Sequence, residues 1–466
     1  MYLLAVITYL GLLVIGSIWG SRKIRTGDDF LVAGRSLPAH VLVFTLLSTW
    51  IGSGSLFAGA GLGYRVGFAA LWQSAGAWVG IALIYWIAPR VRNIAQYTVP
   101  DILELRYGPA ARELGTVTTV IAYSTIAAYQ FRGGGRLLEL LAGVDPKTGA
   151  LITAIFCVIY TSLAGMLSIA YLDVVNGSIM TIGVVLAGGF LVADAGGLSV
   201  ALTQLRPDQV PLFGSLSPQT ALAIFFPTMF LLLGEANMYQ KFFSAKDARA
   251  AKMAVVGWIA GTLIVETLII SIGVFGSQAI VGLGTEASEA IVISVALQAL
   301  PTVVGIVLVC GASAIIVSTA NSFLLTPATN MMHDVYQRFI NPDVSDTQVL
   351  LYTRLMVVAL GVIGYVAGNF FPTILAMALW AYTMYGASIT PALLAAFVWP
   401  RATRLGGVAS IGIGIMTTLV WEIIGMARAV DGVATYPLGF QTIYPALTLS
   451  IFTLISVSLV TRRVDS

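Results

Sequence analysis

Apolar stretches long enough to cross a lipid bilayer recur from one end of this chain to the other. They are uniformly apolar rather than alternating, which is typical of membrane helices and not of a membrane barrel. Because each spanning helix needs about 20 apolar residues, we expect an all-α polytopic membrane protein with about 13 transmembrane helices. The expected spans are residues 1–20, 41–63, 66–88, 114–142, 149–165, 168–192, 218–242, 250–276, 300–332, 348–369, 372–398, 406–425 and 440–461.

The scarcity of charge excludes most other classes of protein. Only 10% of the 466 residues are charged and 58% are hydrophobic, whereas soluble domains carry roughly 25% charged residues. The net charge of +3 gives no reason to expect a nucleic-acid partner. Cys157 and Cys310 lie in apolar runs, and His40 and His333 sit at expected helix ends without forming a cluster. We therefore expect no enzyme, no metal cluster and no cofactor.

The basic residues are distributed unevenly between the expected loops. If the N-terminus lies outside the cell, 18 of the 24 Lys and Arg residues, Lys241 among them, fall on the cytoplasmic side, and four fall outside. Cytoplasmic loops of membrane proteins carry such an excess of basic residues. Arg22, Lys23 and Arg25 follow the first span, as in an N-out helix rather than a signal peptide. The pattern predicts a multi-pass protein of the inner or plasma membrane with its C-terminus in the cytoplasm.

Residues 46–55 (LLSTWIGSGS) interrupt an apolar span with glycine and small polar residues. A helix that unwinds in the membrane frees backbone oxygens for a cation, and Gly52 and Gly54 tolerate the backbone angles that unwinding needs. We expect a broken helix here. The alternative is close packing of small residues against a neighbouring helix.

Residues 311–322 (GASAIIVSTANS) interrupt a second span in the same way. Ser318 and Ser322 are four residues apart and share a helical face, with Thr319 beside them. Hydroxyl oxygens are ligands that hard cations prefer, a preference that we extend from calcium and magnesium to sodium. The alternative is that these hydroxyls bond only to carbonyl oxygens of their own helix.

Ionisable side chains inside a membrane are costly and indicate function by default. Arg136 can pair with Glu139 three residues further along the same helix. Glu235 lies in another small and polar interruption, residues 234–239, and is the acid least expected to be merely structural. The full set of intramembrane candidates is Asp173, Glu235, Glu266, Glu422, Arg132 and Arg136.

Five segments together resemble the sodium:solute symporter family, which includes bacterial proline, pantothenate, sugar and sialic-acid carriers. They are residues 29–38, 49–64, 97–108, 165–175 and 318–336. The resemblance covers nearly the whole chain, and the order and spacing of the segments make it specific. It implies a leucine-transporter-type fold, in which two inverted repeats of five helices surround a site in the middle of the membrane.

On this resemblance, residues 1–466 form a single transmembrane transporter domain. Residues 1–40 supply a lead-in helix and the first cytoplasmic loop. The two five-helix repeats would cover residues 41–192 and 217–398, and residues 402–466 would supply two trailing helices.

The resemblance also implies ligands. A sodium site would use backbone oxygens of Ser48, Ile51 and Ile315 and hydroxyls of Ser318 and Thr319, which lie in the two stretches singled out above. A second sodium, bound by some members, would contact Asp173, Ser318 and Ser322. Contacts to the solute are implied at Ser53, Ser55, Trp72, Gln73, Glu235, Asn237, Tyr239, Trp380 and Tyr385.

The chain departs from the family at three positions. Many members have Gly-Gln-Pro where this chain has Gly234-Glu235-Ala236, and Leu172 and Asn176 replace the usual threonine and glutamine. A carboxylate at Glu235 would attract an ammonium group or carry a proton. It tilts the expected substrate toward a solute that contains nitrogen.

We therefore expect a secondary active transporter that couples sodium to the uptake of a small polar organic solute by alternating access. Its partners would be the solute, sodium and the lipid bilayer, with no nucleic acid and no obligate protein partner. Two alternatives stay open: a proton-coupled carrier that uses Glu235 and Asp173, and sodium-coupled uptake of a sugar or a monocarboxylate.

Overall fold

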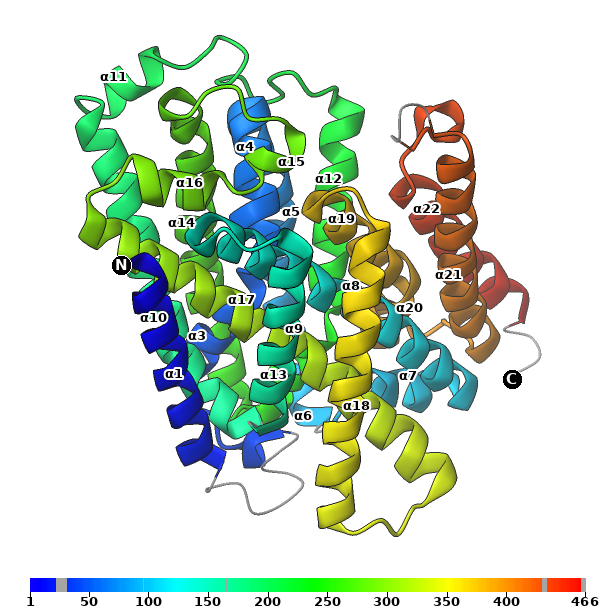
Figure 1. The fold of residues 1–466 in the computed structure, drawn as a ribbon. Helices are drawn as coiled ribbons and strands as arrows, with labels where there is room; N and C mark the ends of the chain where they lie inside the picture. The colour runs from blue at the N-terminus through cyan, green and yellow to red at the C-terminus, as the bar shows by residue number, and fades with distance from the viewer. Residues whose placement is uncertain (22–31, 95, 164–165, 430–433, 462–466) are drawn as a thin grey trace.

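The computed structural model describes residues 1–21, 32–94, 96–163, 166–429 and 434–461, and this part of the chain is almost entirely helical (Figure 1). The basic residues Arg22, Lys23 and Arg25, residues 29–31 of the first family-like segment, and Gly165 lie outside it. The first elements are α1 (Tyr2–Ser21), η1 (Ala33–Arg35), α3 (Ala39–Trp50), η2 (Gly54–Gly59), α4 (Ala60–Val66), η3 (Gly67–Ala70), α5 (Leu71–Ile84), α6 (Ala88–Ile94), α7 (Val99–Tyr107), α8 (Pro109–Ala142), α9 (Pro146–Leu163), α10 (Met166–Asp194) and α11 (Leu198–Thr203). The remaining elements are α12 (Pro218–Gly234), α13 (Ala236–Ser244), α14 (Ala248–Ala279), α15 (Thr285–Ser288), α16 (Ile291–Gln298), α17 (Thr302–Asn330), η4 (Met331–Ile340), α18 (Asp346–Ala367), η5 (Gly368–Phe370), α19 (Ile374–Ser388), α20 (Thr390–Val398), α21 (Arg404–Ala427), η6 (Pro437–Gly439) and α22 (Ile443–Thr461).

Within the described residues, 11 helical segments are long and apolar enough to cross a membrane. Large apolar side chains such as Leu12, Val362 and Phe452 are exposed along the outer helices, as expected for a surface that faces lipid. The all-helical membrane class is therefore confirmed. The count of 13 spans stays a prediction, because α3 has only 12 residues and α8 is not among the 11 segments.

The break expected within residues 46–55 is present. α3 ends at Trp50, Ile51 has extended backbone angles (φ −73°, ψ 95°), and the helix resumes with η2. A Cβ atom on Gly52 would stand 2.8 Å from Gln130 Nε2 on α8 and 2.9 Å from Thr319 Cγ2 on α17. The missing side chain at Gly52 thus lets the broken segment lie directly against both helices.

The expected interruption within residues 311–322 is wrong, because α17 runs unbroken from Thr302 to Asn330. Small polar residues are compatible with a continuous helix when its backbone bonds remain intact and its hydroxyls point to neighbouring elements. The second break lies instead at Glu235, which has extended backbone angles (φ −60°, ψ 116°) between α12 and α13. This position falls inside the polar interruption noted at residues 234–239.

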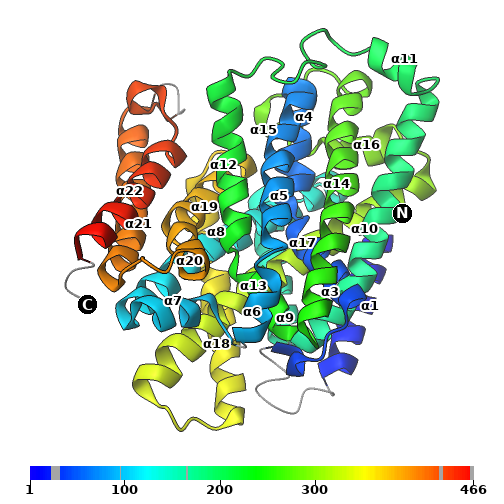
Figure 2. The same ribbon diagram turned by 180° about the vertical axis from the view of Figure 1, so that it is seen from behind.

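The helices form one bundle, in which α17 and α12 each pack against several other helices. α17 packs against α3, α8 and α10, and α12 packs against α5 and α19. We call the end with α6, α7 and the turn between η4 and α18 the lower face, and the end with α11, α15 and α16 the upper face (Figure 1). α1 lies at one edge of the bundle, and the paired helices α21 and α22 lie at the opposite edge (Figures 1 and 2).

On the upper face, Glu289 joins the segment between α15 and α16 to α19. Its carboxylate accepts hydrogen bonds from the backbone N–H groups of Ile374 (3.0 Å) and Leu375 (2.9 Å), at a helix N-terminus that favours negative charge. A Cβ atom on Gly61 would stand 2.7 Å from the Glu289 Cα atom. The α15–α16 segment is therefore held tightly between α4 and α19.

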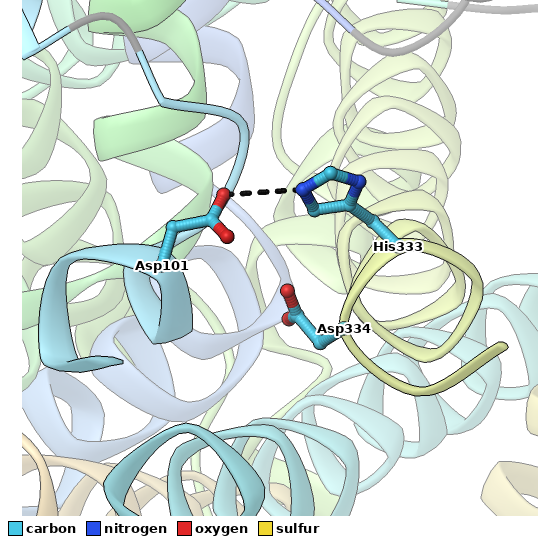
Figure 3. Close-up of side chains that lie close together, drawn as sticks. All are labelled: Asp101, His333 and Asp334. Carbon is cyan, nitrogen blue, oxygen red and sulfur yellow. Dashed lines mark ion pairs between the residues drawn. The ribbon is translucent and has the colours of Figure 1, made fainter. Parts of the chain in front are cut away.

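On the lower face, the Arg112 guanidinium of α8 holds together three carboxylates, two from α7 and one from η4. Its Nη2 atom lies 2.8 Å from Asp101 Oδ1 and 2.7 Å from Asp334 Oδ1, and its Nη1 atom pairs with Glu104. His333 Nε2 lies 3.4 Å from Asp101 Oδ2 (Figure 3). Burial alone would raise the pKa of Asp101, but the hydrogen bond and charge of His333, together with the charge of Arg112, hold that pKa below its ordinary value. This network joins α7, α8 and η4.

The close approach at Gly52 predicts a loss of stability when a side chain is added. Gly52→Ala forces Gln130 or Thr319 to move, and such overpacking typically costs about 1–3 kcal/mol. Gly412→Ala on α21 is the matched control, because no atom lies within 4 Å of its Cβ position. Thermal unfolding of the purified protein should show a lower Tm for Gly52→Ala and an unchanged or higher Tm for Gly412→Ala. Equal Tm values would contradict the close contact.

The lower-face network predicts that Arg112→Met is destabilising by about 3–5 kcal/mol, because the change leaves buried carboxylates without their cation. Arg354→Met, at an exposed position of α18, should change stability little. The deficit of Arg112→Met should shrink at acidic pH, since protonation relieves the repulsion between the carboxylates. Chemical unfolding at neutral and acidic pH measures both effects. A deficit that does not depend on pH would show that packing, rather than charge, is lost.

Candidate functional site

Oxygen atoms from α3 and α17 gather where α3 is broken. Thr319 Oγ1 lies 3.3 Å from the Ser48 carbonyl oxygen and 3.4 Å from the Ile51 carbonyl oxygen. Ser318 Oγ lies 3.2 Å from the same Ser48 oxygen. Ile315 is buried one turn earlier on α17. The structure thus brings together four of the five residues named for sodium, Ser48, Ile51, Ser318 and Thr319, and their carbonyl and hydroxyl oxygens are of the kind that hard cations bind.

Asp173 on α10 lies directly beside this group. Its Oδ1 atom is 2.5 Å from Ser318 Oγ, and its Oδ2 atom accepts a hydrogen bond of 2.5 Å from the Thr45 hydroxyl. Ser322, the third residue named for a second sodium, does not contact Asp173 but lies with its hydroxyl 2.9 Å from Thr49 Oγ1. Asp173 and Ser318 are therefore in direct contact, whereas Ser322 bonds instead to a threonine of α3.

The position of Lys241 differs most from the sequence-based prediction. Lys241 was expected in a cytoplasmic loop that only sets orientation, but its side chain is 1% exposed on α13. Its ammonium group donates to the Thr45 carbonyl oxygen at 2.9 Å and to the Thr49 hydroxyl. Its position directly after the expected polar interruption was the one available signal that this lysine lies inside the bundle.

The second break is bordered by tyrosine hydroxyls. Tyr385 Oη donates to the Gly234 carbonyl oxygen at 2.8 Å, and Tyr239 Oη donates to the Leu233 carbonyl oxygen at 3.0 Å. These bonds satisfy carbonyl oxygens at the end of α12 that have lost their helical partners. Glu235 itself is 2% exposed, and its Oε1 atom has no hydrogen-bond partner among the described residues.

Further unpartnered polar atoms surround the two breaks. Gln130 Oε1 accepts from the Ser53 backbone N–H at 2.9 Å, and Gln73 Nε2 lies 3.4 Å from the Gly54 carbonyl oxygen. Buried polar atoms are normally hydrogen-bonded, so those without partners in the described structure are available to a ligand. Around the breaks they are Ser53 Oγ, Gln73 Oε1, Gln130 Nε2, Glu235 Oε1 and Asn237 Nδ2.

Two aromatic residues predicted to contact solute also make contacts with loop residues. Trp72 stacks on Phe213 and donates to the Leu212 carbonyl oxygen on the upper face. Trp380 is half-buried and packs against Phe371. A role of either ring in solute binding therefore stays a prediction.

Ser55 and Asn237 have protein partners that the sequence did not indicate. Ser55 Oγ lies 3.1 Å from Glu266 Oε1, which also accepts from the Trp50 indole at 2.9 Å. Asn237 Oδ1 accepts from Thr326 on α17. Glu266 therefore supports the broken segment through hydrogen bonds, while its Oε2 atom has no partner in the described structure.

Three polar residues near the first break were missed. Tyr129 Oη lies 3.1 Å from Tyr382 Oη, and a Cβ atom on Gly54 would stand 2.7 Å from Tyr382 Oη. Gln130 is the third, through its bond to Ser53. All three lie in apolar helices at positions that only the packing of α8 and α19 against the break reveals.

The remaining intramembrane candidates have structural partners. Glu422 accepts from Tyr436 and Thr442 at one edge of the bundle. Arg136 pairs with Glu139 at 2.8 Å, as predicted. Arg132 donates to the Phe371 carbonyl oxygen at 2.6 Å. None of these contacts joins the two breaks.

Asp101, His333 and Asp334 form a cluster that the sequence did not predict, each offering a potential metal-ligating atom within 4.8 Å of the others. Figure 3 shows the three side chains converging from α7 and η4. The Arg112 guanidinium already bonds to both carboxylates of this group. A metal ion would have to displace that cation, so the donor set fits an ion-pair network and not a metal site.

Comparisons with known proteins agree with this architecture. The sodium:solute symporter family model matches residues 30–414. The osmoregulated proline transporter OpuE of Bacillus subtilis is 26% identical over 98% of this chain and 94% of its own length. The sodium/proline symporter of Salmonella typhimurium is 26% identical over 89% of this chain and 86% of its own length.

Solved structures show the same fold. A Na⁺-coupled sialic acid symporter in a substrate-bound outward-open state superposes with a TM-score of 0.82, at 16% identity, over 98% of this chain and 97% of that chain. MhsT in complex with L-phenylalanine superposes with a TM-score of 0.57, at 15% identity, over 91% of this chain and 98% of that chain. The expected leucine-transporter-type fold is confirmed. The chain belongs to the sodium:solute symporter family, whose members are multi-pass membrane transporters that couple sodium to the movement of a small solute, and is not an enzyme.

Proposed function

We propose that this transporter takes up a small zwitterionic amino acid, proline or a close analogue, together with sodium. Two relatives that cover most of the chain are named as proline transporters. Membership of the family supports sodium coupling. The polar atoms around the two helix breaks would bind the solute.

The unpartnered carboxylate oxygen of Glu235 is the observation that carries this choice of solute. A buried carboxylate without a hydrogen bond is costly, and the ammonium group of an amino acid would satisfy it. Gln130 Nε2 and Ser53 Oγ, also without partners, can donate to the carboxylate of the same solute. A sugar or a monocarboxylate would bring no ammonium group to this oxygen.

Sodium would act by joining α3 to α17. Ser48 and Ile51 lie on the broken helix, and Ser318 and Thr319 lie on the unbroken one. An ion bound between them favours the conformation in which these elements touch. A ligand shifts a conformational equilibrium only by such a difference in affinity. The broken segment also carries Ser53, so ordering it by sodium prepares the solute site.

The two halves of the fold would each begin with a broken helix. The proposed first repeat, residues 41–192, opens with the break after α3, and the second, residues 217–398, opens with the break at Glu235. The lower face carries Arg90, Arg92 and other basic residues, so it would be cytoplasmic. The upper face would then lie outside the cell.

A proton-coupled carrier is the second candidate, favoured by the burial of Glu235 and Asp173. Uptake of labelled L-proline into proteoliposomes, driven by a sodium gradient and compared with choline or potassium at constant pH, separates the two. We expect uptake only with sodium. Uptake that persists in choline and follows a proton gradient would favour the second candidate.

We predict that Thr319→Ala raises the sodium concentration for half-maximal uptake by about tenfold or more, since a bond to a charged group contributes about 1.5–3 kcal/mol. Thr353→Ala is the matched control, because its buried hydroxyl bonds only to the Val349 carbonyl oxygen of its own helix. Sodium titrations of initial uptake rates measure the effect. Equal sodium dependence in Thr319→Ala and the control would remove Thr319 from the sodium site.

We predict that Glu235→Gln weakens inhibition of uptake by amino acids about tenfold or more, because the charge that balances the solute ammonium is lost. In the same variant, analogues that lack the amine should inhibit uptake about as well as the amino acids do. Glu422→Gln, whose carboxylate bonds to Tyr436 and Thr442, is the control. Competition assays in each variant give the comparison, and an unchanged ranking of competitors would reassign Glu235 to packing.

A further inference from the structure

Lys241 connects the two broken helices. It lies on α13, six residues after the break at Glu235, and its ammonium group bonds to Thr45 and Thr49 of α3. The side chain is 1% exposed, so water is not its partner. Removing a lysine ammonium from water is costly unless nearby negative charges and hydrogen-bond acceptors compensate for the lost hydration.

The two threonines that bond to Lys241 also bond to two of the three residues named for a second sodium. The Thr45 hydroxyl donates to Asp173 Oδ2 at 2.5 Å, and Thr49 Oγ1 lies 2.9 Å from Ser322 Oγ. Lys241 thus reaches both parts of that group through one intervening residue. Its charge also interacts with those of Asp173 and Glu235.

Asp173 needs a positive charge nearby. Its side chain is 1% exposed, and within the described residues no basic group lies in ion-pair distance of it. The hydroxyl groups of Ser318 and Thr45 donate hydrogen bonds to its carboxylate but carry no positive charge. The Lys241 ammonium, separated from Asp173 only by Thr45, is the charge that the fold itself supplies.

A second sodium at this place would meet repulsion. It would need oxygen atoms of Asp173, Ser318 and Ser322, and the Thr49 hydroxyl beside Ser322 already accepts from the Lys241 ammonium. The first sodium group, at Ser48, Ile51 and Thr319, is free of this constraint, because Lys241 donates to none of its atoms. A fixed positive charge therefore lies beside the group named for the second sodium but is not bonded to the group named for the first.

We propose that Lys241 is a tethered cation that takes the place of a second sodium beside Asp173, so that this transporter binds one sodium ion. The inference rests on the proposed sodium coupling and adds its stoichiometry. Because the lysine lies on α13 and its acceptors lie on α3, it also joins the two broken helices.

Equilibrium dialysis of the purified wild-type protein with radiolabelled sodium, in the absence of solute, tests the proposal directly. We expect one bound sodium per chain and a hyperbolic binding curve. Two bound ions would overturn the proposal while leaving sodium coupling intact. No specific sodium binding would instead refute the proposed function on which the inference rests.

Variants assign the effect to the charge of Lys241. Lys241→Met should expose a second site, with two sodium ions bound per chain, whereas Lys241→Arg should keep one. Lys246→Met, at an exposed position just after α13, is the matched control and should bind one ion. Adding Asp173→Asn to Lys241→Met should return the count to one. A folded Lys241→Met that binds one ion would overturn the proposal, and if this variant does not fold, the wild-type count still decides.

Discussion

The contact between the broken helix α3 and the unbroken helix α17 is the constraint on which the rest of the structure depends. It requires α3 to unwind after Trp50, so that carbonyl oxygens of Ser48 and Ile51 leave the helix and meet hydroxyls of α17. It also requires Gly52, since any side chain there would collide with Gln130 and Thr319. A cation bound at this contact, as proposed, would hold these two elements together.

Burial of charge explains how the neighbourhood of that contact is arranged. Each buried ion must be balanced or hydrogen-bonded, and the structure does this in different ways on the lower face and in the centre. On the lower face, Arg112 balances several carboxylates and ties three elements together. In the centre, Asp173 relies on hydroxyls and on the more distant Lys241, and Glu235 is left for a ligand. Several incompletely satisfied groups thus lie where the solute and ion would bind.

The sequence predicted the helical class and the break after Trp50, because long apolar runs and glycine-rich interruptions are local signals. The same kind of signal failed at residues 311–322, where α17 is continuous. Ser318 and Thr319 could be named because helical spacing places them on one face. Lys241 was misplaced, since a basic residue near the end of a span looks like a loop residue until packing shows it buried. The cluster of Asp101, Arg112 and Asp334 joins residues more than 200 positions apart in the chain, and no local pattern predicts such a contact. Trp72 and Trp380 were expected beside the solute, but their loop contacts depend on tertiary packing.

Thermal unfolding of the purified wild-type protein in sodium, potassium and choline tests the central claim most directly. A ligand that binds only the folded state stabilises it by RT ln(1 + c/Kd), where c is the ligand concentration, so the stabilisation grows with that concentration. If the contact between α3 and α17 is a sodium site, the Tm rises with sodium concentration and stays unchanged at equal ionic strength in potassium and choline. An equal rise in all three salts would contradict a specific sodium site at the break in α3.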